Sequence, residues 1–248
     1  MLPLYLYEST EESDQIDFEG TGDLFAEKSA KPAEAKYTRR DAITDAGLQH
    51  FLDAYPGETI TKEDLFYYVY GLLHSPDYRE RYADNLSKEL PRIPAVKTAK
   101  DFWHFSKAGR ALAELHLNYE TVKPYPVKVE VSGKTPLTDD DYRVEQMKYG
   151  KQGKEKDKTT LIYNARITLT GIPLAAYDYV VNGKPALDWV VERQCVKTDK
   201  ASGIVNDAND WAIDTMHNPK YPLELFMRVI TVSLETMKIV EALPPLDC

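Results

Sequence analysis

The sequence predicts an α+β fold: a bundle-like helical part near the N-terminus, a small antiparallel β-sheet in the middle and a long C-terminal helix. Apolar residues recur at three-and-four spacing over residues 65–73 and 222–240, which is the period of one helical face. Over residues 127–131 they alternate with a period of two, as in a half-buried strand. The chain has 248 residues, 43% of them hydrophobic, which is enough for a real core.

The first 37 residues are expected to precede the main domain. Residues 1–7 form a short apolar run that suits an edge strand. Residues 8–36 are acidic and rich in Ala, Ser and Gly, with little apolar periodicity. We expect this second segment to be a poorly ordered linker; an acidic arm that mimics DNA is the other interpretation. The domain would then cover residues 38–248, helical over 38–121, β-rich over 122–171 and helical over 172–248.

Capping residues predict where four helices begin in the helical part. The caps are Thr38, Thr61, Ser75 and Thr98, for helices that end near residues 55, 74, 90 and 119. Asp64 takes the acidic position of a capping box, and Pro76 suits a first helical turn. We expect the helices to pack as a bundle with the tyrosines in its core and rim, although tyrosines could also stack on bases. These tyrosines are Tyr67, Tyr68, Tyr70, Tyr78 and Tyr82.

Short strands and a polar hairpin are expected in the middle of the chain. The predicted strands cover residues 127–131, 142–149, 159–163 and 166–170. Residues 150–158 would form a solvent-exposed hairpin tip. Further on, Pro185 is expected to begin a helix over residues 186–196, residues 198–211 are turn-rich, and Pro222 begins the last long helix.

The charge distribution singles out the β-rich region. The net charge of −9 argues at first against DNA, whose phosphates are neutralised by Lys and Arg. However, residues 1–37 hold nine acids and three bases, a net of −6, whereas residues 143–166 hold seven bases and three acids, a net of +4. Local sign decides where a polyanion docks, so the basic hairpin is the best electrostatic candidate for a DNA contact.

The candidate DNA-contacting residues come from this hairpin and from the later turn. Lys148, Lys151, Lys154, Lys156 and Lys158 would contact phosphates, and Arg143 is a further candidate DNA-binding residue. Gln152, Asn164 and Arg166 would reach base edges. The turn adds Lys197, Lys200 and Asn206. A solvated loop is the plain alternative for the hairpin.

No catalytic or metal site is expected. Asp199, Asp207 and Asp210 lack the register of a calcium loop, so caps and Asx-turns explain them better. The five histidines are scattered without zinc-helix spacing, and Cys195 is expected to be buried packing. Two cysteines make no disulfide framework, no apolar run is long enough to span a membrane and no secretion signal is recognisable, so we expect a cytoplasmic protein.

Three blocks of the sequence resemble a known family. The first begins YYVYGLLHSPDYRERY and closes with LPRIP, the second is IPLAAYDYVVNGKPALDWVVERQCVKTDKASGIVNDANDWA over residues 172–212, and the third is RVITVSLETMKIVEALPPL. They are similar to the C-terminal specificity (target-recognition) domain of Type ISP restriction-modification enzymes, single chains that both cleave and methylate DNA. The blocks span most of residues 65–246, so they are far more specific than a short motif.

The resemblance implies sequence-specific binding of double-stranded DNA by a part that is not itself an enzyme. The helicase-like ATPase, adenine methyltransferase and nuclease would lie elsewhere in the full-length chain, with ATP, Mg and S-adenosylmethionine as their cofactors and none in this part. Consistently, the sequence has neither a phosphate-binding Gly-rich loop nor an Asn-Pro-Pro-Tyr motif. The adjacent methyltransferase and helicase-like domains would be its partners, and residues 1–7 would be the last strand of the methyltransferase.

Two other functions stay open at the sequence level. A structural coupling module would bind sibling domains or other proteins through its helices and touch DNA little; the acidic balance outside residues 143–166 favours it. A stand-alone hydrolase would need a nucleophile and a base that converge, and no Gly-x-Ser-x-Gly elbow is present.

Overall fold

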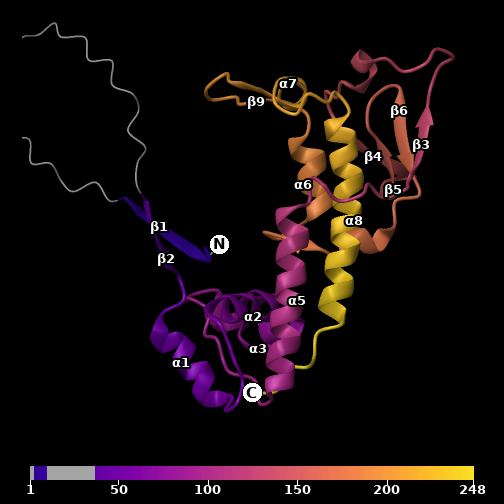
Figure 1. Ribbon diagram of the computed structural model, residues 1–248. Coiled ribbons are helices and arrows are strands. Elements are labelled where there is room, and N and C mark those ends of the chain that lie inside the picture. Colours follow the sequence, from indigo (N-terminus) through magenta and orange to yellow (C-terminus); the bar gives the residue numbers. More distant parts are fainter. Residues whose placement is uncertain (1–2, 10–36) are drawn as a thin grey trace, which may run out of the picture.

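The computed structural model describes residues 3–9 and 37–248, so the linker predicted over residues 8–36 lies almost wholly outside the described residues. The helices are α1 Asp45–Ala54, α2 Lys62–His74, α3 Pro76–Arg81, α4 Ala83–Leu86, α5 Ala99–Leu117, α6 Ala186–Arg193, α7 Ala208–Asp214 and α8 Tyr221–Glu241. The strands are β1 Tyr5–Ser9, β2 Tyr37–Asp41, β3 Lys128–Val131, β4 Lys148–Gln152, β5 Glu155–Ile162, β6 Ile167–Thr170, β7 Val180–Val181, β8 Lys184–Pro185, β9 Val196–Thr198 and β10 Val205–Asp207. Two 3₁₀ turns are η1 Asp139–Tyr142 and η2 Leu174–Tyr177. The predicted α+β fold is confirmed (Figure 1).

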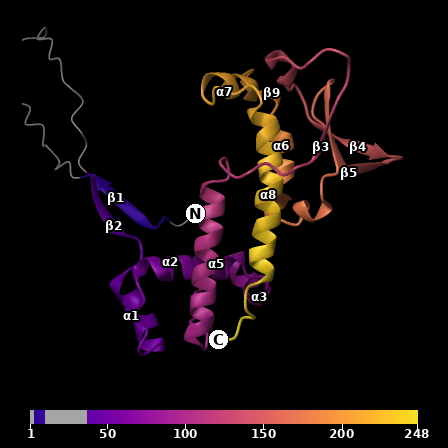
Figure 2. The same ribbon diagram turned by 45° about the vertical axis from the view of Figure 1, so that its right-hand side comes forward.

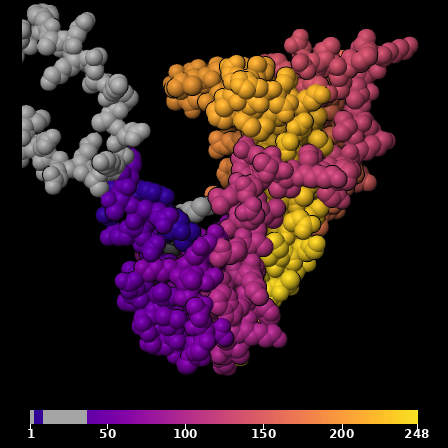
Figure 3. Space-filling view, viewed as in Figure 1, coloured from indigo at the N-terminus to yellow at the C-terminus, as the bar shows by residue number. Residues whose placement is uncertain are grey.

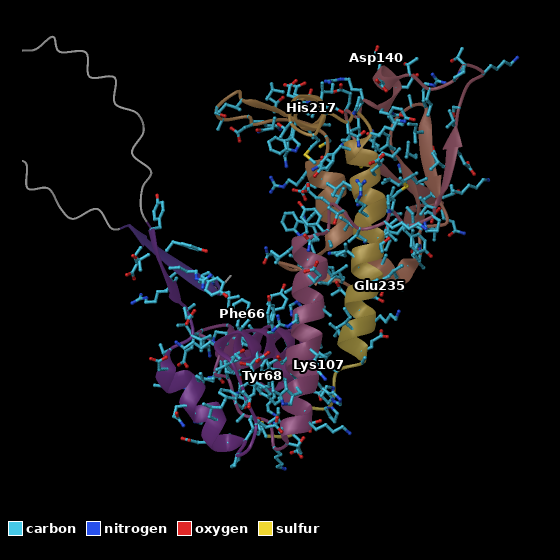
Figure 4. The ribbon with its side chains drawn as sticks, in the orientation of Figure 1. Phe66, Tyr68, Lys107, Asp140, His217 and Glu235 are labelled. Carbon is cyan, nitrogen blue, oxygen red and sulfur yellow. The ribbon has the colours of Figure 1, made fainter. Side chains whose placement is uncertain are left out.

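Helices α1, α2, α3 and α5 surround one aromatic core. Tyr68 of α2 is fully buried and stacks on Phe102 of α5, with ring centroids 4.8 Å apart. Its hydroxyl donates to Pro94 O at 2.6 Å, and the Tyr78 hydroxyl donates to Arg92 O at 2.7 Å. Figure 4 places Tyr68 among these helices. The predicted core position of these two tyrosines is confirmed, and each pays for burial of its hydroxyl with a hydrogen bond.

Helices α2 and α5 cross in direct backbone contact. A Cβ atom added to Gly71 would lie 2.2 Å from Phe105 O, and one added to Gly109 would lie 1.8 Å from Tyr67 O. Only glycine leaves room for such an approach. The crossing therefore fixes the geometry of the helical part.

The middle of the chain forms a four-stranded antiparallel sheet in the order β3-β6-β5-β4. Leu161, Ile167 and Leu169 of β5 and β6 are fully buried against α6 and α8, including Phe226 and Ile230. Because side chains alternate along a strand, the opposite face of β5 is exposed, as Ile162 shows. In Figure 2 the β4–β5 hairpin projects away from the helices.

The two cores are joined by α5 and α8, which run side by side (Figures 1 and 2). His116 of α5 shares one hydrogen bond with the Tyr70 hydroxyl of α2 at 2.8 Å and another with Thr236 of α8 at 2.9 Å. Its ring also stacks on Tyr179, with centroids 5.4 Å apart. Burial and the neighbouring His74 lower the pKa of His116 to about 4. A neutral imidazole therefore ties the helical part to the rest of the domain.

The N-terminal strand β1 pairs with a segment that was predicted to begin a helix. Strand β1 pairs antiparallel with β2, which occupies the start of the helix predicted over residues 38–55. That prediction was wrong at its N-terminus, since Thr44 rather than Thr38 caps α1, accepting from Gly47 N at 3.1 Å. The caps predicted at Thr61, Ser75 and Thr98 are confirmed.

Four other predicted boundaries were wrong. Residues 150–158, predicted as a hairpin tip, belong mostly to β4 and β5, and only Gly153 and Lys154 lie between these strands. The helix predicted over residues 77–90 is interrupted at Tyr82, whose backbone leaves the helical region at φ −110° and ψ 20°. The strand predicted over 142–149 is mostly loop, because Val144 bonds the Asn209 side chain instead of a neighbouring strand. The helix predicted over 186–196 ends at Arg193, because the following residues enter β9.

Candidate nucleic-acid interface

An open groove of about 1180 Å³ lies between the β4–β5 hairpin and α6. Its charged residues are Lys148, Lys151, Lys156, Lys158, Lys184 and Lys197, against Glu145, Asp188 and Glu192, a net of +3. We refer to it as the lysine groove. It brings together five lysines that the sequence singled out from two separate regions, the basic hairpin and the later turn.

One wall of the lysine groove is a hairpin that carries like charges opposite each other. Gly153 turns the chain at φ +65°, and the register pairs Lys151 with Lys156 directly across the two strands. In the described part of the chain, no ion pair includes Lys148, Lys151, Lys154 or Lys156. Directly opposed like charges destabilise a β-ladder. The hairpin thus carries four lysines that form no ion pair in the described part of the chain.

The floor of the groove is a fixed polar cluster. Lys158 lies 3.2 Å from Asp188 and its ammonium sits 4.5 Å from the Tyr177 ring centre. The Tyr149 hydroxyl donates to Asp188 at 2.6 Å. Burial, followed by the Asp188 carboxylate, raises the pKa of Tyr149. Lys158 is therefore occupied with holding β5 against α6, whereas the lysines nearer the hairpin tip extend into solvent.

The opposite wall comes from β8, α6 and β9. Lys184 pairs with Glu192 and also lies over the Trp189 ring, 4.1 Å from its centre. Lys197 lies 3.6 Å from the same carboxylate. Cys195 is buried there, as predicted, and burial raises the pKa of its thiol. Two lysines share one acid, so this wall also keeps a net positive charge.

Three residues predicted to contact DNA are engaged within the protein. The Asn164 amide donates to Asp141 O and Arg143 O, while its oxygen accepts from two backbone amides. Arg166 pairs with Asp141 at 2.8 Å and donates to Ser132 O and Thr135 O. Arg143 pairs with Glu145 and Asp207. All three hold loops together beside a smaller depression of about 610 Å³, and DNA contact by them stays a prediction.

The turn after β9 is a second ordered hairpin, formed by β9 and β10. Asp199 accepts from Ala201 N at 3.1 Å and from Ser202 N at 2.8 Å, and Asp207 accepts from Asn209 N at the start of α7. The turn and capping roles predicted for Asp199 and Asp207 are confirmed. Among residues 3–9 and 37–248 no cluster of His, Cys, Asp and Glu could hold a metal ion.

The remaining predicted residues lie on the two hairpins outside the lysine groove. Gln152 and Lys154 are exposed at the tip of the β4–β5 hairpin. Lys200 and Asn206 are exposed on the β9–β10 hairpin. Gln152 and Asn206 make no side-chain hydrogen bond among those found in the described residues, so their amides are free to reach base edges.

Lys184 is the groove lysine that sequence reasoning missed. It stands alone in Asn-Gly-Lys-Pro, far from the run of lysines that marks the basic hairpin. It enters the groove only because β7 and β8 turn back beside α6. No local pattern in the sequence carries that information.

Comparison with known proteins gives one family and several solved structures. The family described as the Type ISP C-terminal specificity domain matches residues 1–225. The ATP-dependent Type ISP restriction-modification enzyme LlaBIII bound to DNA is 37% identical, with a TM-score of 0.75 over 99% of this chain and 14% of that chain. A nuclease-deletion mutant of the Type ISP enzyme LlaGI, in complex with a DNA substrate mimic, is 46% identical, with a TM-score of 0.65 over 77% of this chain and 17% of that one.

A third structure, a DrdV–DNA complex, is 34% identical, with a TM-score of 0.68 over 84% of this chain and 20% of that chain. This chain therefore spans between 14% and 20% of the length of the three structures. The comparison with curated proteins gives no match. The resemblance carried by the three sequence blocks is confirmed.

Proposed function

This chain belongs to the family of Type ISP C-terminal specificity domains, and we propose that it binds double-stranded DNA at a specific sequence through the lysine groove. The observation that carries the proposal is the opposed pair Lys151 and Lys156, which have no carboxylate partner in the described chain. Such a pair costs stability in the free protein and is compensated when a polyanion binds. The DNA bound in two of the similar structures, and the DNA substrate mimic bound in the third, support the same partner.

Different side chains would contribute to affinity and to sequence recognition. Lys148, Lys151, Lys154 and Lys156 contact phosphates, which sets affinity and register without sequence information. The free amides of Gln152 and Asn206 read base edges, since an amide can pair with adenine through two hydrogen bonds. Lys158 and Lys184 hold the groove walls in place.

Selection of DNA from a randomised duplex library tests the recognition of a specific sequence. The chain is incubated with the library at about physiological salt, and the retained DNA is sequenced. Enrichment of one asymmetric motif is the expected result. No enrichment by a folded chain, with a longer chain that includes the neighbouring domain also failing, would contradict the proposal.

Charge reversal tests whether the lysine groove is the contact surface. The variant Lys151→Glu/Lys156→Glu is expected to weaken binding of the selected duplex at least about tenfold and to lower the salt dependence by about two phosphate contacts. The matched control is Lys100→Glu/Lys107→Glu on α5, which makes the same change of charge away from the sheet (Figure 4 labels Lys107). Equal weakening by both variants would mean that only overall charge matters.

A second function, docking of sibling domains, is supported by α7. Trp211 and Ile213 are 54% and 52% exposed on this helix, and the neighbouring acids Asp210 and Asp214 would repel a phosphate backbone. We propose that α7 contacts protein rather than DNA. Trp211→Ala should leave the affinity of the chain for the selected duplex unchanged.

The remaining proposals concern the whole enzyme. By its family, the chain is expected to be the non-catalytic part of a restriction endonuclease and adenine methyltransferase that uses ATP, Mg and S-adenosylmethionine in the cytoplasm. Residues 1–37 would lead from the methyltransferase into a domain that starts at residue 38. No helix in the described part of the chain is long and apolar enough to cross a membrane.

A further inference from the structure

The β9–β10 hairpin ends in an aliphatic side chain that has no place in the core. Ile204 directly precedes β10 and is 60% exposed. It follows the polar residues Asp199, Lys200 and Ser202 in the chain. The hairpin and α7 form the orange projection at the upper left of Figure 3. Turns of this kind normally carry polar residues, so an exposed isoleucine at the tip costs solvation that the fold does not recover.

The hairpin is held rigidly at both ends. At the tip, Asp199 accepts from three donors of Ala201 and Ser202, and its own amide donates to Ile204 O at 2.8 Å. At the base, buried Asn209 bonds both backbone groups of Val144. A β-branched side chain on such a frame has few rotamers left to lose on binding. Ile204 is therefore presented in a fixed position.

The register puts Ile204 on the same face of the hairpin as Lys197, which is one of the residues that line the lysine groove. Asn206 stands directly opposite Lys197, which lines the groove. Alternation along the strand places Ile204 with Asn206, and Val205 on the other face with Asp207. This face of the ribbon therefore carries a cation, a free amide and the aliphatic tip. It also carries Asp199 opposite Ile204, with the Asp199 carboxylate held by Ala201 and Ser202.

We propose that this face of the β9–β10 hairpin enters the major groove and that Ile204 reads the C5-methyl group of a thymine. The inference rests on the proposed DNA-binding function. A two-stranded ribbon fits the major groove, where the methyl group is the apolar mark of an A·T pair. Lys197 and Lys200 flank the tip and attract the phosphates, so the ligand of this apolar tip is DNA rather than a protein surface.

Deoxyuridine substitution tests the contact, because uracil differs from thymine only by the missing methyl group. In the duplex recovered by selection, each thymine is replaced singly and binding is measured by fluorescence anisotropy. One replacement is expected to weaken binding by the wild-type chain about threefold to tenfold, the effect of one lost apolar contact. Ile204→Ala should show the same loss on the thymine duplex and no further loss on the uracil duplex.

Val205→Ala is the matched control, since Val205 is 58% exposed on the opposite face of the same hairpin. It should bind both duplexes as the wild type does. The inference is overturned if no thymine is sensitive, if Ile204→Ala loses affinity equally on both duplexes, or if Val205→Ala has the same effect. In all three cases the chain still binds its selected duplex, whereas failure of the proposed function itself would show as absence of a selected duplex and would remove the inference with it.

Discussion

The α2–α5 crossing is tightly packed within the protein, whereas the β4–β5 hairpin carries charged side chains that have no ion-pair partner in the described chain. At the crossing, two glycines bring backbones so close that a methyl group has no room, and aromatic rings fill the space around them. At the hairpin, two lysines face each other in solvent without a carboxylate partner in the described chain. The crossing is therefore stabilised by its own packing. The hairpin would be stabilised by binding a polyanion, which reduces the repulsion between its lysines.

This difference separates scaffold from contact surface more clearly than composition does. The chain is acidic overall, and most of its arginines in the sheet region are paired internally. Within the strands of the four-stranded sheet, the cations without an ion pair in the described chain are Lys148, Lys151 and Lys156, all on the β4–β5 hairpin. A polyanion therefore finds a local site on a protein whose total charge would repel it.

The largest expected effect comes from filling the crossing. Gly109→Ala puts a methyl group 1.8 Å from Tyr67 O, so the helices must separate, and we expect a loss of roughly 3 kcal/mol or more in the free energy of unfolding. Urea unfolding followed by circular dichroism measures it. Gly47→Ala, whose methyl group meets only Thr44 Oγ1 at 3.2 Å, should change stability by less than about 1 kcal/mol. Equal stability of Gly109→Ala and the wild type would show that the crossing has slack.

Asn209 gives the next effect, because the β9–β10 hairpin depends on it. Asn209→Ala leaves the amide and carbonyl of Val144 without their partner, which should cost about 2 kcal/mol and loosen the hairpin base. Hydrogen exchange at the Val144 amide should accelerate in parallel. Asn206→Ala, an exposed asparagine of the same hairpin, is the control and should change stability by less than about 0.5 kcal/mol. Unchanged exchange in Asn209→Ala would mean that other contacts fix the hairpin.

His116 provides a pH-dependent test of the junction between the two cores. Its folded-state pKa of about 4 lies below the ordinary value of 6.5, so the unfolded chain binds a proton first as the pH falls. Stability should therefore decrease by roughly 1–2 kcal/mol from pH 7 to pH 5. Urea unfolding at each pH measures this slope. His116→Gln should remove most of it, and burial of His74, whose pKa is also lowered, should account for the rest.

The sequence predicted what depends on local signals. Thr61, Ser75 and Thr98 cap helices as expected, because a capping hydroxyl acts within three residues. The same rule predicted a cap at Thr38, and this prediction was wrong. Thr38 lies in β2, which pairs with a strand about thirty residues earlier in the chain, a contact that local sequence does not show. The Tyr82 break in the second half of the helical hairpin had no sequence signal either.

The sequence predicted where the positive charge of the candidate site lies, but it could not predict which side chains come together there. The run of lysines in residues 148–158 marked the right hairpin. Composition could not show that Asn164 and Arg166 are engaged in loop hydrogen bonds, or that Lys184 and Lys197 lie on the same wall of the lysine groove beside Glu192. Ile204 was invisible for the same reason: an isoleucine in a turn becomes informative only when its exposure is known.

The smallest expected effect tests the comparison at the hairpin itself. Lys156→Glu converts the opposed lysines into an ion pair, which should raise stability by about 0.5 kcal/mol, and Lys151→Glu/Lys156→Glu restores like charges and should return it close to the wild-type value. Affinity for the selected duplex should instead fall at each step, because every reversal removes a phosphate contact. Urea unfolding and fluorescence anisotropy on the same three proteins would measure both series. Stability that fell in step with affinity would indicate that the hairpin is damaged rather than recharged, and a parallel rise of both would contradict the role of these lysines in binding DNA.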